Sequence, residues 1–130
     1  MFSIRQLFKR KSNQRVTAQM LMDVAGDFIP MGDSVMDKQE YLNCAVSAWN
    51  ISCLELSKQK KAIKKYISSY RKMNPTFTKK DLQDEEHNIT LLMKNKLELY
   101  PEVKTQIASA KIMKIGNKEH VTVASLRVIK

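Results

Sequence analysis

The two histidines, His87 and His120, are the first candidates for chemistry in this sequence, because an imidazole can bind a metal or move a proton near neutral pH. His87 follows Asp84 by three residues, a spacing that brings two side chains together on one face of a helix. The same spacing produces ordinary surface ion pairs, and no further ligands follow at the intervals that metal sites use. We therefore expect no metal site.

The candidate nucleophiles are Cys44, Cys53 and Ser57. A nucleophilic side chain needs a base nearby and a third group that orients the base, and the sequence shows no such set. The two cysteines lie nine positions apart inside helical patterns, which indicates small buried side chains instead of a zinc site or a disulfide framework. Three scattered glycines cannot form a phosphate-binding loop. We expect a protein that is not an enzyme and that uses no cofactor.

The net charge of +10 is unevenly distributed along the 130 residues. Residues 58–80 contain nine lysines and arginines and no acid, while residues 17–57 and 81–103 have net charges of −5 and −4. Such alternation either lets neighbouring helices attract one another or divides the surface into basic and acidic faces that steer a charged partner. The sequence favours neither of these two uses.

These charged residues must be positioned mainly by helices, because apolar residues recur at three- and four-residue spacing through most of the chain. A first helix of about three turns contains Met20 and ends before Pro30, which cannot continue it. A second helix begins at the capping pair Asp37 and Glu40. Asn50, near its end, is expected to be a buried polar group with a backbone partner. The wide apolar stripe of this helix makes it the expected centre of the core, and consists of Tyr41, Leu42, Ala45, Val46 and Trp49.

The third predicted helix has an apolar side and a cationic side. Ser57 is its expected N-cap and Pro75 closes it. The apolar side is expected to face the core and consists of Ile63, Tyr66, Ile67, Tyr70 and Met73. At 100° per residue, the opposite side contains Lys58, Lys61, Lys65 and Lys72. A fourth helix begins at the pair Thr78 and Asp81 and ends at Pro101.

The C-terminal part of the chain has the composition of a hairpin. Residues 107–115 and 120–129 are rich in strand-forming side chains and flank a turn at residues 116–118. A helix beginning at Pro101 fits the same apolar positions and stays open as an alternative. We predict a predominantly helical α+β fold, a bundle of four to five helices with a C-terminal β-hairpin at about residues 103–129. The alternative is an all-α fold with a short terminal strand.

The expected organisation is a single domain at residues 15–130, preceded by a short amphipathic basic segment at residues 1–14. No stretch approaches the ~20 apolar residues of a membrane-spanning helix, and the N-terminal region lacks the continuous apolar run of a signal peptide. We therefore expect a cytoplasmic protein. The N-terminal segment nevertheless offers candidate contacts to a membrane surface or a partner, at Phe2, Ile4, Leu7 and Phe8.

Binding without catalysis is the function that the sequence favours. The first hypothesis is engagement of another protein, as an adaptor, an inhibitor or an immunity-type protein, or through self-association. The second is sequence-independent nucleic-acid binding through the basic face within residues 58–80, which would equally suit an acidic partner. The third is peripheral membrane attachment through residues 1–11. The candidate contacts of the basic face are Lys58, Lys61, Lys65 and Lys72.

Overall fold

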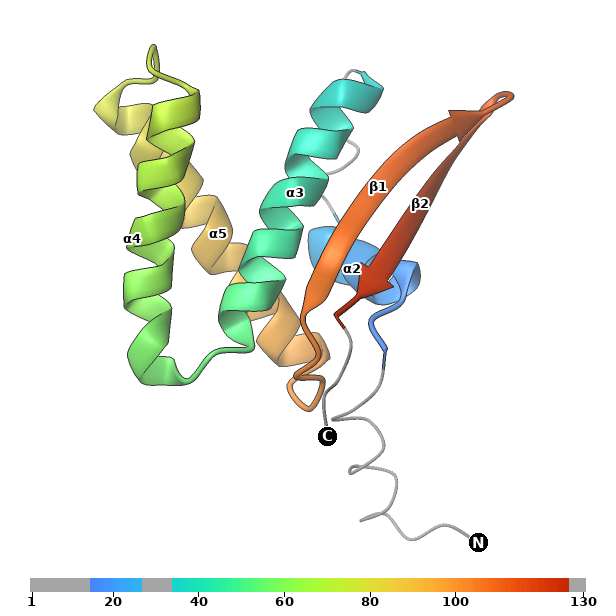
Figure 1. Cartoon of the computed structure of the whole chain (residues 1–130), viewed down its shortest axis with the longest axis horizontal. Helices are drawn as coiled ribbons and strands as arrows, with labels where there is room; N and C mark the ends of the chain where they lie inside the picture. The colour runs from blue at the N-terminus through green and yellow to red at the C-terminus, as the bar shows by residue number, and fades with distance from the viewer. Residues whose placement is uncertain (1–14, 27–33, 127–130) are drawn as a thin grey trace, which may run out of the picture.

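Four helices and one β-hairpin make up the part of the chain that this computed structural model describes, which is residues 15–26 and 34–126. In chain order they are α2 (Ala18–Ala25), α3 (Val35–Ser52), α4 (Leu56–Met73), α5 (Lys79–Leu99), β1 (Ile107–Ile115) and β2 (Lys118–Ser125). Helix α3 lies between the hairpin and α4, and α2 and α5 pack on it (Figure 1). The predicted α+β fold is confirmed, and the all-α alternative is wrong because residues 107–115 form a strand.

Two helix starts show how capping chemistry sets the boundaries. Helix α3 begins earlier than predicted, because the hydroxyl of Ser34 accepts a hydrogen bond from the backbone N–H of Asp37 at 3.1 Å. The predicted cap at Asp37 and Glu40 is therefore wrong, and Asp37 lies in the first turn. At α5 the predicted pair is confirmed, since Thr78 and Asp81 each bond the other's backbone N–H in a capping box.

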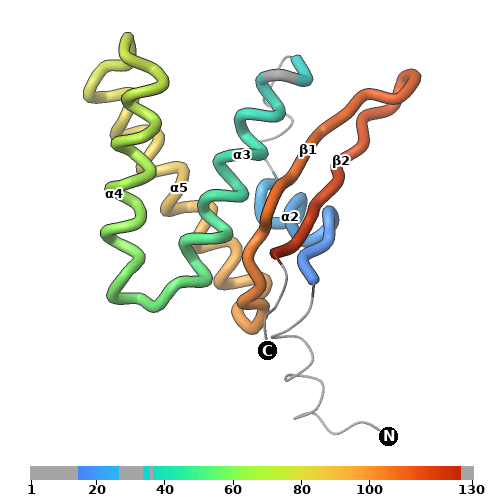
Figure 2. The backbone as a smooth tube through the Cα atoms, in the orientation of Figure 1, coloured from blue at the N-terminus to red at the C-terminus, as the bar shows by residue number. Residues whose placement is uncertain are grey.

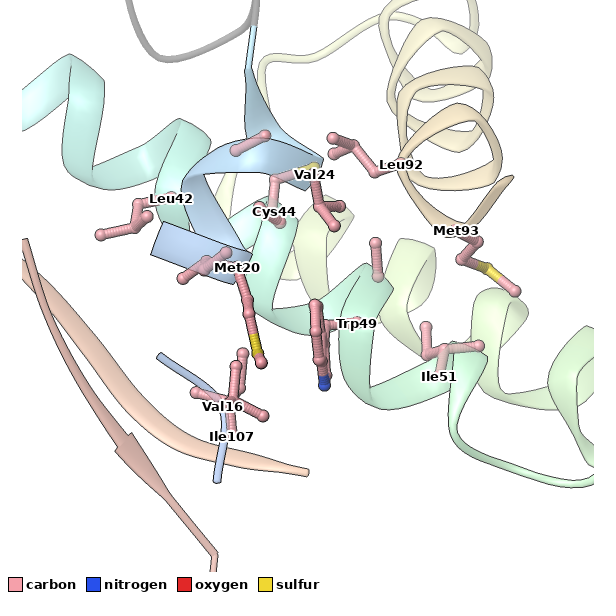
Figure 3. Packing of buried hydrophobic residues seen from close by; sticks show 14 of the residues in the cluster. Val16, Met20, Val24, Leu42, Cys44, Trp49, Ile51, Leu92, Met93 and Ile107 are labelled. Atoms are coloured by element: carbon pink, nitrogen blue, oxygen red, sulfur yellow. The ribbon is translucent and has the colours of Figure 1, made fainter. Parts of the chain in front are cut away.

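The core is centred on α3, as predicted. Trp49 is fully buried, and its indole N–H donates a hydrogen bond to the carbonyl oxygen of Thr105 at 2.9 Å. Figure 3 shows its ring among apolar side chains from α2, α5 and β1. The other fully buried side chains of the cluster include Leu21, Val24, Leu42, Ile89, Leu92 and Val103.

Helix α4 is peripheral. It contains no fully buried residue and lies at the end of the molecule away from the hairpin (Figure 2). Its N-cap position is Glu55, so the predicted N-cap Ser57 is wrong and lies inside the first turn. Met73 is 81% exposed, so the prediction that it faces the core is also wrong. The rest of the predicted apolar stripe is half-buried, at Ile63, Tyr66, Ile67 and Tyr70.

The outer edge of β1 is closed by side-chain amides of α3 instead of a third strand. Asn50 accepts a hydrogen bond from the N–H of Ile107 at 2.7 Å and donates one to the carbonyl of the same residue at 2.9 Å. Gln39 accepts from the N–H of Ile112 at 2.8 Å and donates to the carbonyl of Ala110 at 3.0 Å. The spacings match, because eleven residues of helix and five residues of strand both span about 16 Å. The expected backbone partner of Asn50 is thereby confirmed, but the residue is half-buried and not fully buried as predicted.

A β-bulge in β1 lets both amides reach the same edge. The register of the hairpin shifts by one residue between Ile107 and Ser109. In a regular strand, Ile107 and Ile112 would direct their backbone groups to opposite edges and their side chains to opposite faces, because they are an odd number of residues apart. The extra residue of the bulge turns both toward α3, where both side chains are buried.

Candidate anion-binding face on helix α4

Helix α4 has a broad cationic side without any acid. Its 18 residues contain seven lysines and arginines, all exposed, and no aspartate or glutamate. We call these seven residues the α4 basic face: Lys58, Lys60, Lys61, Lys64, Lys65, Arg71 and Lys72. At 100° per residue, the four lysines predicted from the sequence fall within about 60° of one another, so the helix brings them together on one side.

The charge of the α4 basic face is not compensated by ion pairs in the part of the chain that the structure describes. None of its seven cations forms an ion pair with residues 15–26 or 34–126. The ion pairs found there are Lys38 with Glu119 at 2.8 Å and Lys94 with Glu98 at 4.0 Å. The exposed Lys79, in the first turn of α5, adds further positive charge close by in sequence. The field of these cations is therefore directed into solvent, where it can attract an anionic partner.

A shallow hollow borders the α4 basic face on the side of α5. It encloses about 230 Å³ and is lined by Lys64, Ile67, Ser68, Arg71 and Glu86. Lys64 and Arg71 were not among the four predicted contacts, because the helical wheel places them nearer the apolar stripe than the other four lysines. Their charge was visible in the sequence, but their position beside Glu86 of α5 depends on how the two helices pack.

The aromatic side chains of α4 hold the helix on α5. The hydroxyl of Tyr66 donates a hydrogen bond to a carboxylate oxygen of Glu85 at 2.8 Å. The ring of Tyr70 lies 6.0 Å from that of Tyr66 and 5.4 Å from that of Phe77, measured between centroids. Burial raises the pKa of Tyr70 to about 12. These contacts engage both tyrosines in packing, so they do not offer free faces on which nucleic-acid bases could stack.

The two cysteines have the environment of structural side chains. Cys44 is buried, as predicted, and Cys53 is partly buried; both are free thiols. Burial raises the pKa of the Cys44 thiol, and the charge of Glu85 raises it further. Burial also raises the pKa of Cys53. Because the thiolate is the reactive form, these raised pKa values disfavour a nucleophilic role for either residue.

A buried lysine, Lys96 of α5, has an environment unlike that of the α4 basic face. It is 1% exposed, its ammonium group donates a hydrogen bond to the carbonyl of Val103, and it lies 5.3 Å from the centre of the Trp49 ring. Burial lowers the pKa of Lys96 from its ordinary value of 10.5. A lysine of low pKa can serve as a nucleophile, but this one is closed to a substrate. We interpret it as part of the core.

We expect the substitution Lys96→Met to change how stability depends on pH. Between the folded pKa of Lys96 and 10.5, the unfolded chain binds this proton more strongly than the folded chain. The contribution of Lys96 to the free energy of unfolding therefore rises with pH in that window. Urea unfolding of both chains from neutral pH to 10.5 measures it.

The expected result is that the difference in unfolding free energy, unsubstituted chain minus variant, increases with pH. Subtracting the variant is needed because Cys44 and Tyr66 have raised pKa values in the folded state and act in the opposite sense. A difference that stays constant across the pH range would contradict the lowered pKa of Lys96.

A second hollow lies between α3 and β1. It is open, encloses about 700 Å³, and is lined by Val35, Gln39, Glu40, Ser109, Ala110, Lys111 and Ile112. The amide of Gln39 is already bonded to the β1 backbone, so its polar atoms are committed to the fold. The two charged residues of the lining, Glu40 and Lys111, have opposite signs. This hollow therefore lacks the concentrated charge that distinguishes the α4 basic face.

Within residues 15–26 and 34–126, no three or more His, Cys, Asp or Glu side chains gather as a metal site would require. No helix of these ranges combines the length and apolar character needed to cross a bilayer. The predicted N-terminal contacts lie outside the described residues: Phe2, Ile4, Leu7 and Phe8.

Comparisons with known proteins do not assign this chain to a family. No family model matches the sequence, and searches of the curated proteins and of the solved structures found no similar chain. The function of the protein is therefore inferred from its own residues and their geometry.

Proposed function

We propose that this protein is a non-catalytic binding protein whose α4 basic face docks on an acidic surface of another protein. The observation that supports this most directly is the missing counter-charge: seven exposed cations stand on one acid-free helix, and none is paired within residues 15–26 and 34–126. Like charges at three- and four-residue spacing repel one another and destabilise a helix, so an external anion would relieve a cost that the isolated chain bears. The same charges would steer and orient the encounter.

Two exposed apolar side chains at the ends of α4 favour a protein partner that also covers the helix ends, because at 100° per residue both lie outside the arc of the four predicted lysines. Leu56 is 83% exposed and Met73 is 81% exposed. Both gain free energy when a partner covers them, and methionine is enriched in protein interfaces. A phosphate backbone offers no apolar surface to either. The residues best suited to base stacking, Tyr66 and Tyr70, are half-buried and engaged in packing.

We expect reversal of four charges on α4 to reduce binding of the partner at least about tenfold, because each attraction to an acidic surface becomes a repulsion. A photo-reactive amino acid at Ser69, an exposed position of α4, would label the partner in cells without removing a charge. Labelling is expected to be lost in the quadruple variant with Lys58→Glu, Lys61→Glu, Lys65→Glu and Lys72→Glu.

The matched control reverses four exposed lysines elsewhere, and so changes the net charge equally: Lys94→Glu, Lys104→Glu, Lys111→Glu and Lys114→Glu. This control is expected to label the same partner at nearly the level of the unsubstituted chain. Equal labelling by the α4 variant, or equal loss in the control, would contradict docking through α4.

Nucleic acid is the second candidate, because Lys58 and Lys72 are separated by about 21 Å of helix, a length that could follow several phosphates. Titrations of labelled duplex and single-stranded DNA at rising salt separate the two functions. Nucleic-acid binding requires an affinity that falls with salt, disappears on charge reversal, and is unchanged by Leu56→Ser with Met73→Ser. Docking on a protein predicts weak or no DNA binding and reduced partner labelling in that apolar variant.

A further inference from the structure

The two edges of the hairpin differ in whether other elements bond their outward backbone groups. β1 faces α3, whose Gln39 and Asn50 bond its outward backbone groups. β2 lies on the far side of β1 from α3 (Figure 1). Among the described residues, a contact covers the end of β2, where the hydroxyl of Ser125 bonds the backbone N–H of Val16 at 2.8 Å and its carbonyl at 3.3 Å. In the part of the chain that the structure describes, the hairpin therefore has one closed edge and one that is open over most of its length.

The register identifies which backbone groups point outward from β2. Ala110 and Ile112 turn their bonded groups toward α3, so they form the non-hydrogen-bonded pairs of the ladder. Their partners are Val123 and Val121, and in an antiparallel ladder such partners also turn their N–H and C=O groups away from each other. Glu119 lies two residues before Val121, so its backbone N–H and C=O groups point to the same edge. By this alternation, the three N–H and three C=O groups of these residues point away from β1, and none of them takes part in the backbone hydrogen bonds that the described residues form outside the ladder.

The open edge lacks the devices that usually protect an edge strand. Proteins guard free edges with proline, bulges or lysines in the strand. β2 contains no proline, the register shift of the hairpin lies in β1, and the one lysine, Lys118, is at the first position. The charge of Glu119 is compensated by Lys38 at 2.8 Å, so it does not repel an approaching strand. An unguarded edge of this kind is a template for another strand.

We infer that β2 pairs with β2 of a second copy of this chain, antiparallel, about a two-fold axis at Val121. In this register Val121 faces Val121 of the second copy, and Glu119 faces Val123 of the second copy. All three outward residues of each chain then fall in hydrogen-bonded pairs, which gives six hydrogen bonds across the axis. The product is a four-stranded antiparallel sheet in place of two separate two-stranded ones.

The sequence of β2 favours its own copy as the occupant, because the antiparallel register is self-complementary. Lys118 faces Ala124 of the second copy, and His120 faces Thr122 of the second copy, so no like charges oppose each other. The half-buried Val121 and Val123 of both chains lie on one face of the joined sheet. This continues the apolar surface that each copy already buries against its own helices.

Self-association is tested first on the full chain, by sedimentation equilibrium over a range of concentration. Six backbone hydrogen bonds predict a Kd between about 1 µM and about 1 mM, so dimers should accumulate within that range. A chain that stays monomeric at the upper limit overturns the proposal. A monomer is also the result expected if the edge is occupied by another segment of the same chain or by a foreign strand.

A matched pair of variants isolates the backbone contribution. Glu119→Gln and Glu119→Pro both remove the ion pair with Lys38, but only proline removes the outward N–H and places a ring against the approaching strand. That N–H makes no bond inside the hairpin, so both variants should melt at similar temperatures. We expect the proline variant to dimerise at least about tenfold more weakly than the glutamine variant. Equal dimerisation of the two overturns the proposal.

The register is tested by disulfide trapping, which does not depend on the proline variant. His120→Cys mixed with Thr122→Cys should form a disulfide between chains, because the two positions face each other as a non-hydrogen-bonded pair. Met113→Cys, which is paired with His120 inside the hairpin but lies on the closed-edge strand, should not cross-link to Thr122→Cys. Equal trapping of the two mixtures overturns the antiparallel β2 pairing.

Discussion

Replacing Trp49 by alanine is expected to lower the free energy of unfolding by about 5 kcal/mol, which is a large part of the stability of an ordinary domain. The fully buried ring occupies the centre of the core, so its removal leaves a cavity bordered by three helices and β1. The carbonyl of Thr105 also loses its donor. Urea unfolding followed by circular dichroism measures the loss without relying on tryptophan fluorescence.

Trp49→Phe separates the cavity from the hydrogen bond. Phenylalanine keeps most of the ring volume but has no N–H for the Thr105 carbonyl, so we expect a cost of about 2 kcal/mol. If the phenylalanine variant were as unstable as the alanine variant, the stability would depend on the indole hydrogen bond more than on the filled volume. A loss below about 1 kcal/mol for alanine would contradict the central position of the ring.

The substitution Asn50→Leu is expected to cost about 3 kcal/mol, because leucine has similar volume but leaves both backbone groups of Ile107 without a partner. Hydrogen exchange should show the loss locally: the Ile107 amide should exchange faster. The amide of Ile112, which Gln39 holds, should change much less.

Asn43→Leu is the control for this substitution. Asn43 is an exposed asparagine on the same helix, and among the described residues its side chain accepts one hydrogen bond, from the amide of Gln39 at 2.8 Å. Its replacement is expected to cost less than about 0.5 kcal/mol. Similar losses at Asn43 and Asn50 would mean that helix propensity, and not closure of the β1 edge, explains the effect.

The sequence was sufficient to predict the order of the helices and strands, but not how deeply the side chains of each one are buried. Periodicity identified α3 as the central helix and the hairpin as the end of the fold, because spacing depends only on neighbouring residues. The same spacing placed Met73 in the core, although it is 81% exposed. Apolar periodicity tells which side of a helix faces inward, whereas burial depends on whether another element covers that side.

Part of the candidate site could also be predicted from neighbouring residues alone. The common side of the four α4 lysines follows from the helical repeat, so the sequence predicted it. The lack of ion-pair partners for these lysines could not be predicted from the sequence. Acids of α5 such as Glu86 lie beside α4, yet within residues 15–26 and 34–126 they form no ion pair with it. For Asn50, the need of the side-chain amide for a backbone partner was predictable, but the partner Ile107 lies 57 residues further along the chain.

That separation of 57 residues between Asn50 and Ile107 has a consequence for how the protein is made. Chains are synthesised at about 5–20 residues per second, so α3 leaves the ribosome about 3 to 11 s before the strand that its amides close. During this interval the Trp49 surface and the two amides have no β1 to cover them. The interval is when the nascent chain is most exposed to chaperones and to aggregation, and it ends only when the last quarter of the sequence emerges.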